Sequence, residues 1–375
     1  MCPTPGSPTI TPDIAASAPA SVTNHLATRL LPTPHELRRH SPLEDTARHV
    51  VMMSRRDIAT IIHGRDDRLL VIVGPCSIHD PVAAHDYAVR LADQIQRFSD
   101  DLYIVMRVYG EKPRTTVGWK GLVNDPDLDG SGDIERGLRI QRDVFRDVLS
   151  LGVPTATEFV EPITTTYIHD VVAWGCVGAR TVESPVHRQM TSSLSMPIGF
   201  KNATDGGIQQ AIDAIQAASS PHHFVGTDQD GRVGVITSPG NPDGHVILRG
   251  GASGPNYDTN SVLTANERLT AAGLHAAVTI DASHGNSGKD HIRQRAVVSD
   301  IAERIAEGEP GISGIMMESF LVPGQQSHDE AMIRQHGREA LTYGQSITDG
   351  CMGWETTVSA LEELARAVHA RGHKA

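Results

Sequence analysis

The feature that most constrains this chain is an alternation of short apolar runs with longer amphipathic segments. Residues 69–74 read LLVIVG, a continuous apolar run typical of a strand that is buried on both faces. The segment that follows, 81–98, has the apolar spacing of a helix. Repeated strand–helix units predict an α/β fold with a parallel sheet, either closed into a barrel or doubly wound.

The expected elements keep this order along the chain. The expected strands are 69–74, 102–108, 154–159, 176–180, 198–202, 245–250, 277–282 and 312–318, and the expected helices are 81–98, 134–150, 163–174, 206–218, 260–272, 290–307 and 355–370. Residues 222–238 alternate in polarity around Asp-Gly, which predicts a β-hairpin inserted between strands five and six. Because no strand is followed by GxGxxG, we favour a (β/α)8 TIM barrel over a doubly wound sheet.

Composition changes along the chain predict three segments. Residues 1–25 are rich in Pro, Ser, Thr and Ala without the features of a signal peptide, so we expect a flexible tail. Residues 26–66 form a helical N-terminal extension for oligomerisation or regulation, with one helix starting at Ser41-Pro42. Residues 67–375 form the catalytic barrel. The sequence contains no run of 18 apolar residues, so no transmembrane helix is predicted.

Charge and cysteine content narrow the class of partner. Thirty-three Lys and Arg against 45 Asp and Glu give a net charge of −12, which argues against nucleic acid or a membrane as partner. Cys2, Cys76, Cys176 and Cys351 are irregularly spaced, unlike a disulfide framework, so we expect a cytoplasmic protein.

Against this acidic average, residues 106–121 (MRVYGEKPRTTVGWKG) concentrate positive charge directly after a predicted strand. Taken alone, the stretch is also consistent with a solvated basic loop. In a barrel, however, chemistry lies at the carboxyl ends of the strands, and every predicted strand here ends in polar or ionisable residues. The sequence therefore predicts a functional site at that end of the barrel.

Five of these strand-end residues are cations that we expect to converge on one mouth: Arg107, Lys112, Arg180, Lys201 and Arg249. Unpaired, they would repel one another, so they predict a polyanionic small ligand with phosphate and carboxylate groups. Arg114 and Thr115 are placed to bind a second phosphorylated substrate. No Walker loop is present, so nucleotides are not expected.

A second group combines a thiol, an imidazole and two carboxylates: Cys76, His284, Glu318 and Asp349. This donor set suits one divalent first-row metal ion, and the sequence does not distinguish Mn, Fe, Co or Zn. A buried core thiol at Cys76 and a structural histidine at His284 remain alternatives. Cys176 and Cys351 are expected to be core residues, and His79, His187 and His245 are further candidates without supporting spacing.

These stretches together resemble the type I, microbial-type 3-deoxy-D-arabino-heptulosonate 7-phosphate (DAHP) synthases. The resemblance rests on GPCSIHD (74–80), MRVYGEKPRTTVGWKGLVNDPDLDGS (106–131), ATEF (156–159), GARTVESPVHRQMTSSLSMPIGFKNATDG (178–206), HVILRGG (245–251), DASHGNSGKDH (281–291), GIMMESFLVPGQQ (314–326) and YGQSITDGCMGWE (343–355). They occur in the family's order and cover almost everything from residue 30 onward.

The resemblance implies condensation of phosphoenolpyruvate (PEP) with erythrose 4-phosphate at the entry to the shikimate pathway of aromatic amino acid biosynthesis. It implies metal ligation by Cys76, His284, Glu318 and Asp349, and substrate binding by Arg107, Lys112, Arg114, Thr115, Glu158, Ala179, Arg180, Lys201 and Arg249. Lys112, His284, Asp349 and Cys76 are the expected catalytic residues. In the related octulosonate-phosphate synthases the KPRT stretch reads differently, which favours the four-carbon aldose. A homo-oligomer, dimer or tetramer, is also implied, with an aromatic amino acid as candidate effector.

The chain departs from the family pattern at several positions. Gly110 stands where many members carry Phe, and Gly288 and Asp290 also differ. The regions expected to form the effector site, 164–166 and 226–231, are unlike the best-known members, so the effector stays open. A paralogue that uses a modified tetrose is the alternative in the same class. A barrel without activity and a metal-dependent nucleic-acid enzyme are less favoured, because all nine site positions are present and the chain is acidic.

Overall fold

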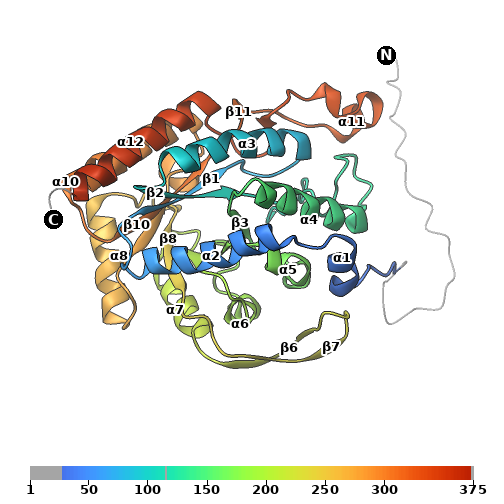
Figure 1. The fold of residues 1–375 in the computed structure, drawn as a ribbon, viewed down its shortest axis with the longest axis horizontal. Helices are drawn as coiled ribbons and strands as arrows, with labels where there is room; N and C mark the ends of the chain where they lie inside the picture. Colours follow the sequence, from blue (N-terminus) through green and yellow to red (C-terminus); the bar gives the residue numbers. More distant parts are fainter. Residues whose placement is uncertain (1–27, 115, 373–375) are drawn as a thin grey trace, which may run out of the picture. The chain divides into compact units, whose positions relative to one another are not determined.

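Eight parallel strands close into a barrel in the computed structural model, which describes residues 28–114 and 116–372 (Figure 1). The strand order is β1-β10-β9-β8-β5-β4-β3-β2, so each strand pairs with its neighbour along the chain once the inserted hairpin is set aside. The predicted (β/α)8 barrel is confirmed. The chain divides into two units, Met1–Leu31 and Pro32–Ala375, and all that follows concerns the second.

The barrel is built from strands surrounded by helices. The strands are β1 (Leu69–Gly74), β2 (Leu102–Arg107), β3 (Thr155–Glu158), β4 (Trp174–Val177), β5 (Ile198–Lys201), β8 (Gly244–Leu248), β9 (Val278–Asp281) and β10 (Ile312–Glu318). The surrounding helices are α3 (Pro81–Arg97), α4 (Ile134–Ser150), α5 (Pro162–Ile168), α6 (Pro185–Ser192), α7 (Gln209–Ala218), α8 (Thr259–Ala271), α10 (His291–Glu307) and α12 (Trp354–Gly372).

Several further elements decorate this barrel. They are α1 (Pro34–His40), α2 (Asp45–Ile62), the 3-10 helices η1 (His169–Val171) and η2 (Arg338–Ala340), β6 (His222–Thr227), β7 (Val233–Ser238), α9 (His284–Ser287), β11 (Val322–Gln325), α11 (Glu330–His336) and β12 (Gln345–Ser346). β6 and β7 form the predicted antiparallel hairpin, which extends away from the barrel in Figure 1. Nothing in the sequence reading predicted β11, β12 or α11.

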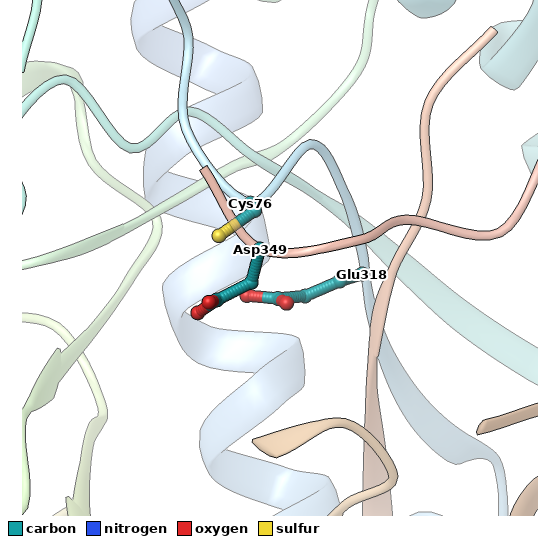
Figure 2. A group of neighbouring side chains, drawn as sticks. All are labelled: Cys76, Glu318 and Asp349. Atoms are coloured by element: carbon teal, nitrogen blue, oxygen red, sulfur yellow. The ribbon is translucent and has the colours of Figure 1, made fainter. Parts of the chain in front are cut away.

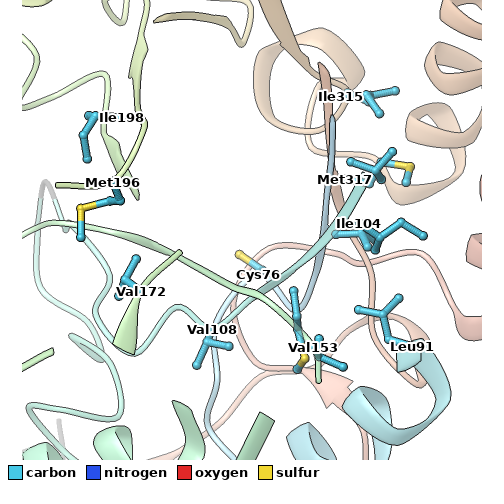
Figure 3. Packing of buried hydrophobic residues seen from close by; sticks show 14 of the residues in the cluster. Cys76, Leu91, Ile104, Val108, Val153, Val172, Met196, Ile198, Ile315 and Met317 are labelled. Atoms are coloured by element: carbon cyan, nitrogen blue, oxygen red, sulfur yellow. The ribbon is translucent and has the colours of Figure 1, made fainter. Parts of the chain in front are cut away.

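The strands bury both faces because successive side chains point to opposite sides. In β1, Val71 and Val73 belong to the cluster between strands and helices, whereas Leu70 and Ile72 belong to a separate cluster inside the barrel. Figure 3 shows outward-facing members of the first cluster, such as Ile104 of β2. The same alternation decides which residues point into the site at the strand ends.

The N-terminal extension closes one end of the barrel. Ile58, Ile61 and Ile62, at the end of α2, belong to the same buried cluster as Leu70 and the other residues inside the barrel. The helices of the extension therefore share a core with the barrel. The predicted boundaries at 26–66 and 67–375 stay a prediction, and the predicted flexible tail, 1–25, lies outside the described residues.

A buried cation ties α4 to the extension and to η1. The guanidinium of Arg142 donates to both carboxylate oxygens of Asp170, each at 2.8 Å, and its Nε donates to the carbonyl oxygen of Ser41 at 2.9 Å. Arg38 of α1 approaches the same carboxylate at 3.4 Å. The Arg38 and Arg142 guanidinium groups outweigh burial and lower the pKa of Asp170.

Two local predictions were wrong. The expected helix 163–174 ends earlier, because Trp174 opens β4 and the apolar residues before it lead into that strand; a short apolar run does not distinguish helix from strand. The expected helix start at Ser41-Pro42 is also wrong, since Ser41 caps the end of α1 and α2 begins at Asp45. Helix α6 was not predicted.

Among the described residues, every helix is too short or too polar to span a bilayer.

Arg142→Ala should lower the free energy of unfolding by about 3 kcal/mol, because truncation leaves the partly buried Asp170 carboxylate without its bidentate partner. Urea unfolding followed by circular dichroism measures the change. Arg139→Ala, on the same helix, removes an exposed pair with Glu135 and should cost less than about 0.5 kcal/mol. Equal losses in the two variants would contradict this account of the buried pair.

Candidate functional site

A layer of charged and small residues lies above the apolar interior of the barrel. The next inward-facing position at the carboxyl end of each strand is Gly74, Arg107, Glu158, Gly178, Lys201, Arg249, Asp281 or Glu318. Gly178 leaves room for its neighbour, because a Cβ there would lie 2.2 Å from Glu158 Oε1. The layer holds three cations and three carboxylates, so the strand ends bring opposite charges together.

Two of the five predicted cations are paired within this layer. Arg107, fully buried, lies 3.2 Å from Glu318 and stacks on the Tyr109 ring at 3.9 Å. Lys201 Nζ lies 3.5 Å from Asp281 Oδ2 and 3.8 Å from Glu158 Oε2. The argument that all five cations would repel one another therefore fails for Arg107 and Lys201.

Cys76, Glu318 and Asp349 converge from three separate segments, and one donor atom from each lies within 4.8 Å of the others (Figure 2). Lys112 Nζ lies 3.0 Å from Cys76 Sγ. Burial and the Glu318 carboxylate raise the pKa of Cys76, although Lys112 opposes them. Burial lowers the pKa of Lys112, but Cys76, Glu318 and Asp349 outweigh it and raise that pKa overall.

His284, the fourth predicted ligand, lies beside this group and is not part of it. Its Nε2 is 3.8 Å from Glu318 Oε1, while its Nδ1 is 2.8 Å from Asp281 Oδ2. His284 has a φ of 48°, a left-handed conformation that β9 and the following turn must hold in place. The Ser283 hydroxyl, also 2.8 Å from Nδ1, and the Asp281 carboxylate together orient the imidazole so that its other nitrogen faces Glu318.

Sequence reasoning missed Asp281 as a site residue. It is fully buried and contacts both Lys201 and His284, which outweigh burial and lower its pKa. Its place three residues before His284, at the end of the same strand, was the signal that could have identified it. Asp281 links a predicted substrate cation to a predicted metal ligand.

The donor set fits a divalent first-row metal ion. Burial and the neighbouring carboxylates of Glu318 and Asp349 disfavour the thiolate of Cys76, as its raised pKa shows. A cation among them would relieve that repulsion and favour the thiolate. Cys76, Glu318 and Asp349, with His284 beside them, are the residues that would hold it. The identity of the metal stays open among Mn, Fe, Co and Zn.

A cavity opens at this end of the barrel beside the metal-binding candidates. Its lining includes Lys112, Arg114, Glu158, Ala179, Arg180, Lys201, Arg249, His284 and Asp349. Arg180 Nη1 donates to the carbonyl oxygen of Pro113 at 3.0 Å, which joins the loop after β4 to the basic loop after β2. Thr115 lies outside the described residues. The structure therefore brings together all the other predicted substrate residues except Arg107, which is buried against Glu318.

The sequence analysis missed two further residues at or next to the cavity. Lys289 lines the cavity and donates to Asp349 at 3.2 Å. Glu111, next to Lys112, accepts a hydrogen bond from Thr164 Oγ1 at 2.7 Å, and burial raises the pKa of Glu111 to about 7. Neither residue has a spacing in the sequence that singles it out.

The remaining candidates have structural surroundings. The Nδ1 atom of His187, in α6, lies 3.0 Å from Oγ of Ser184, the residue that caps the start of this helix. His245 packs against Trp174 inside the barrel. His79 is buried against Phe320. Cys176 and Cys351 are buried core residues as expected, and Cys351 Sγ also accepts the backbone N–H of Cys76 at 3.4 Å.

Comparison with known proteins places the chain in an enzyme family. The model of the DAHP synthetase I family matches residues 43–362. The phospho-2-dehydro-3-deoxyheptonate aldolase of Corynebacterium glutamicum is 56% identical over 341 residues, 91% of this chain and 92% of that protein. The Phe-sensitive aldolase of Escherichia coli K12 is 50% identical over 342 residues, 91% and 95% of the two chains. A solved phospho-2-dehydro-3-deoxyheptonate aldolase from Francisella tularensis SCHU S4 superposes with a TM-score of 0.89 at 49% identity, covering 93% of this chain and 99% of that one.

Glu318→Gln should lower the affinity for Mn²⁺ at least about tenfold, because it removes a charged donor while keeping the shape of the side chain. Isothermal titration calorimetry on the purified protein measures this, and Glu309→Gln, which changes a carboxylate paired with Arg304, is the control. His284→Ala tests whether the imidazole joins the ligand set. Unchanged Mn²⁺ affinity in Glu318→Gln would contradict the assignment.

Proposed function

The chain belongs to the DAHP synthetase I family, and on that premise we propose that it condenses PEP with D-erythrose 4-phosphate and water. The products are DAHP and inorganic phosphate, in the first step of the shikimate pathway. The observation that carries the proposal is the cavity that Lys112, Arg180 and Arg249 line together with Asp349, one of the three metal-binding candidates. Lys112 also lies 3.0 Å from Sγ of a second candidate, Cys76. Cations suit the phosphate and carboxylate of PEP, and oxygen and sulfur donors suit the metal.

Different cations of the cavity lining bind the two substrates. Arg180 and Arg249 line the cavity without a carboxylate partner recorded among the described residues, so their guanidinium forks are placed to bind the PEP phosphate and carboxylate. Lys112 and Arg114 follow on the basic loop, where they suit the phosphate of the aldose. Fixing both substrates reduces the entropic cost of aligning them.

The reaction forms one carbon–carbon bond, between C3 of PEP and the aldehyde carbon, and adds a water oxygen to C2 before phosphate leaves. Lys112, which its anionic neighbours keep protonated, is positioned to give a proton to the new alkoxide. Asp349 or His284, which both line the cavity, orients the water. When bound, a divalent metal supplies Lewis-acid polarisation of the aldehyde.

Lys112→Met should lower kcat by at least about 100-fold, because it removes the ammonium group that faces both Cys76 and the cavity. The loss of PEP is followed with erythrose 4-phosphate and added Mn²⁺, and product mass distinguishes DAHP from a product of a modified tetrose. Lys120→Met, an exposed lysine of the same loop, is the control. Absence of PEP consumption by the wild-type protein with any first-row divalent metal would end the proposal, as would full activity after treatment with EDTA.

We further propose that an aromatic amino acid binds between α5, α6 and the β6–β7 hairpin. A cavity of about 860 Å³ lies there, lined by apolar residues that include Met190, Leu194, Phe224 and Ile236 and by the polar residues Gln189 and Ser193. The apolar walls suit an aromatic ring and the polar groups suit its amino acid end. The Phe sensitivity in the name of the Escherichia coli relative supports this kind of effector.

Gln189→Trp should weaken inhibition by the effective aromatic amino acid at least about tenfold, because the indole would occupy the cavity. The kcat without inhibitor should stay unchanged, since Gln189 lies away from the barrel mouth. Inhibition curves with Phe, Tyr and Trp provide the measurement, and Gln216→Trp on the exposed face of α7 is the control. Equal inhibition of wild type and Gln189→Trp would contradict the assignment of this cavity.

The hairpin also supports the proposed homo-oligomer, a dimer or tetramer. Val225, Val233 and Val235 are each about three-quarters exposed, and Val225 pairs with Val235 on neighbouring strands. A contiguous exposed apolar patch is typical of a protein interface. A monomer in sedimentation velocity at micromolar concentration would contradict the proposed oligomer.

The proposed cytoplasmic location agrees with Cys76, Cys176 and Cys351 being free thiols, and cell fractionation tests this location.

A further inference from the structure

Gly110 lies in the basic loop, between the buried Arg107 and the cavity residue Lys112, and its surroundings leave no space for a side chain. A Cβ built at Gly110 would lie 1.8 Å from Oε1 of Gln141 and 2.2 Å from its Cδ. The φ angle of Gly110 is not in the left-handed region, so the backbone conformation itself accepts other residues. The side chain of Gln141 is therefore what any residue larger than glycine at position 110 would have to displace.

Gln141 reaches this position from α4, in the outer layer of the barrel. Its side chain is 1% exposed, and its Nε2 donates to the carbonyl oxygen of Val108 at 3.3 Å. The same carbonyl accepts a hydrogen bond from Thr157 Oγ1 at 3.0 Å. Among the described residues, Gln141 Oε1 has no hydrogen-bond partner, because it packs against Gly110. The amide thus fills the space beside the loop and binds the end of β2.

The opposite side of Gly110 is equally crowded. A Cβ at Gly121, whose φ is 117°, would lie 2.3 Å from the carbonyl oxygen of Gly110. That carbonyl accepts the backbone N–H of Val123 at 3.1 Å, and the N–H of Lys112 donates to the carbonyl of Lys120 at 2.8 Å. The backbone at 110 is therefore held between Gln141 on one side and the returning arm of the loop on the other.

We propose that Gln141 is a positioning residue for Lys112, and that Gly110 and Gln141 form a size-matched pair that fixes where the basic loop leaves the barrel. Neither residue lines the cavity, so the pair acts on Lys112 through the backbone and does not select the aldose by contact. Lys112 Nζ lies 3.0 Å from Cys76 Sγ, and displacing the loop would lengthen that contact. The consequence for turnover rests on the proposed function, whereas the packing itself does not.

A double-mutant cycle with Gly110→Ala, Gln141→Ala and the combined variant tests the pair. Gly110→Ala should lower kcat at least about tenfold, with the KM for PEP changed less than about threefold, because Arg180 and Arg249 stay in place. In the Gln141→Ala background the same Gly110→Ala change should lower kcat by less than threefold, since the methyl group then has space. Gly372→Ala, where a Cβ meets nothing within 4 Å, is the matched control.

Hydrogen exchange of the backbone amides of 108–123 gives a readout that needs no substrate. Gly110→Ala and Gln141→Ala should each speed exchange at Lys112 and Val123 by at least about tenfold, and the combined variant should recover protection relative to Gly110→Ala. Equal effects of Gly110→Ala in both backgrounds, in turnover and exchange, would overturn the pairing. If the wild-type protein does not consume PEP, the proposed function fails, while the hydrogen-exchange cycle still tests the packing. If Gly110→Ala does not fold, folding of the combined variant supports the pair. Failure of the combined variant to fold contradicts the pair.

Discussion

The buried charge layer at the carboxyl ends of the barrel strands is the constraint on which the site depends. Moving an ion out of water costs several kcal/mol even after relaxation, so a layer of this kind survives only if its members neutralise one another. Arg107 meets Glu318, and Lys201 meets Asp281 and Glu158. Five of its six charged members therefore form ion pairs before a substrate arrives, and the sixth, Arg249, lines the cavity.

The cavity at the mouth of the barrel, which Arg249 of the layer also lines, has a different electrostatic character. Lys112, Arg114, Arg180 and Arg249 line the cavity, and together they make the mouth locally positive in a chain whose net charge is −12. Because the acidic surface elsewhere repels anions, such a mouth concentrates a phosphorylated ligand where it is needed. The division is physical: buried charges are paired and orient their neighbours, while partly exposed charges remain available to bind.

Asp281 connects the predicted substrate-binding part of the site to the predicted metal-binding part. It holds Lys201 on one side and the imidazole of His284 on the other, so a disturbance at the end of β9 would reach both a predicted substrate cation and a predicted metal ligand. The closure of the opposite end of the barrel by Ile58, Ile61 and Ile62 has a complementary role. It keeps the interior dry, which strengthens the ion pairs in the layer above.

The sequence by itself determined the barrel, because strands buried on both faces appear as continuous apolar runs and parallel strands require helical connections. It also predicted which polar residues share one end of the barrel, since those that follow the strands must lie there; Cys76 and Glu318 are an example. Only the tertiary structure decided which charges are paired, that Asp281 lies beside His284, and that Gln141 fills the space a side chain at position 110 would need. These depend on distances between segments far apart in the chain, and neither periodicity nor composition encodes such distances.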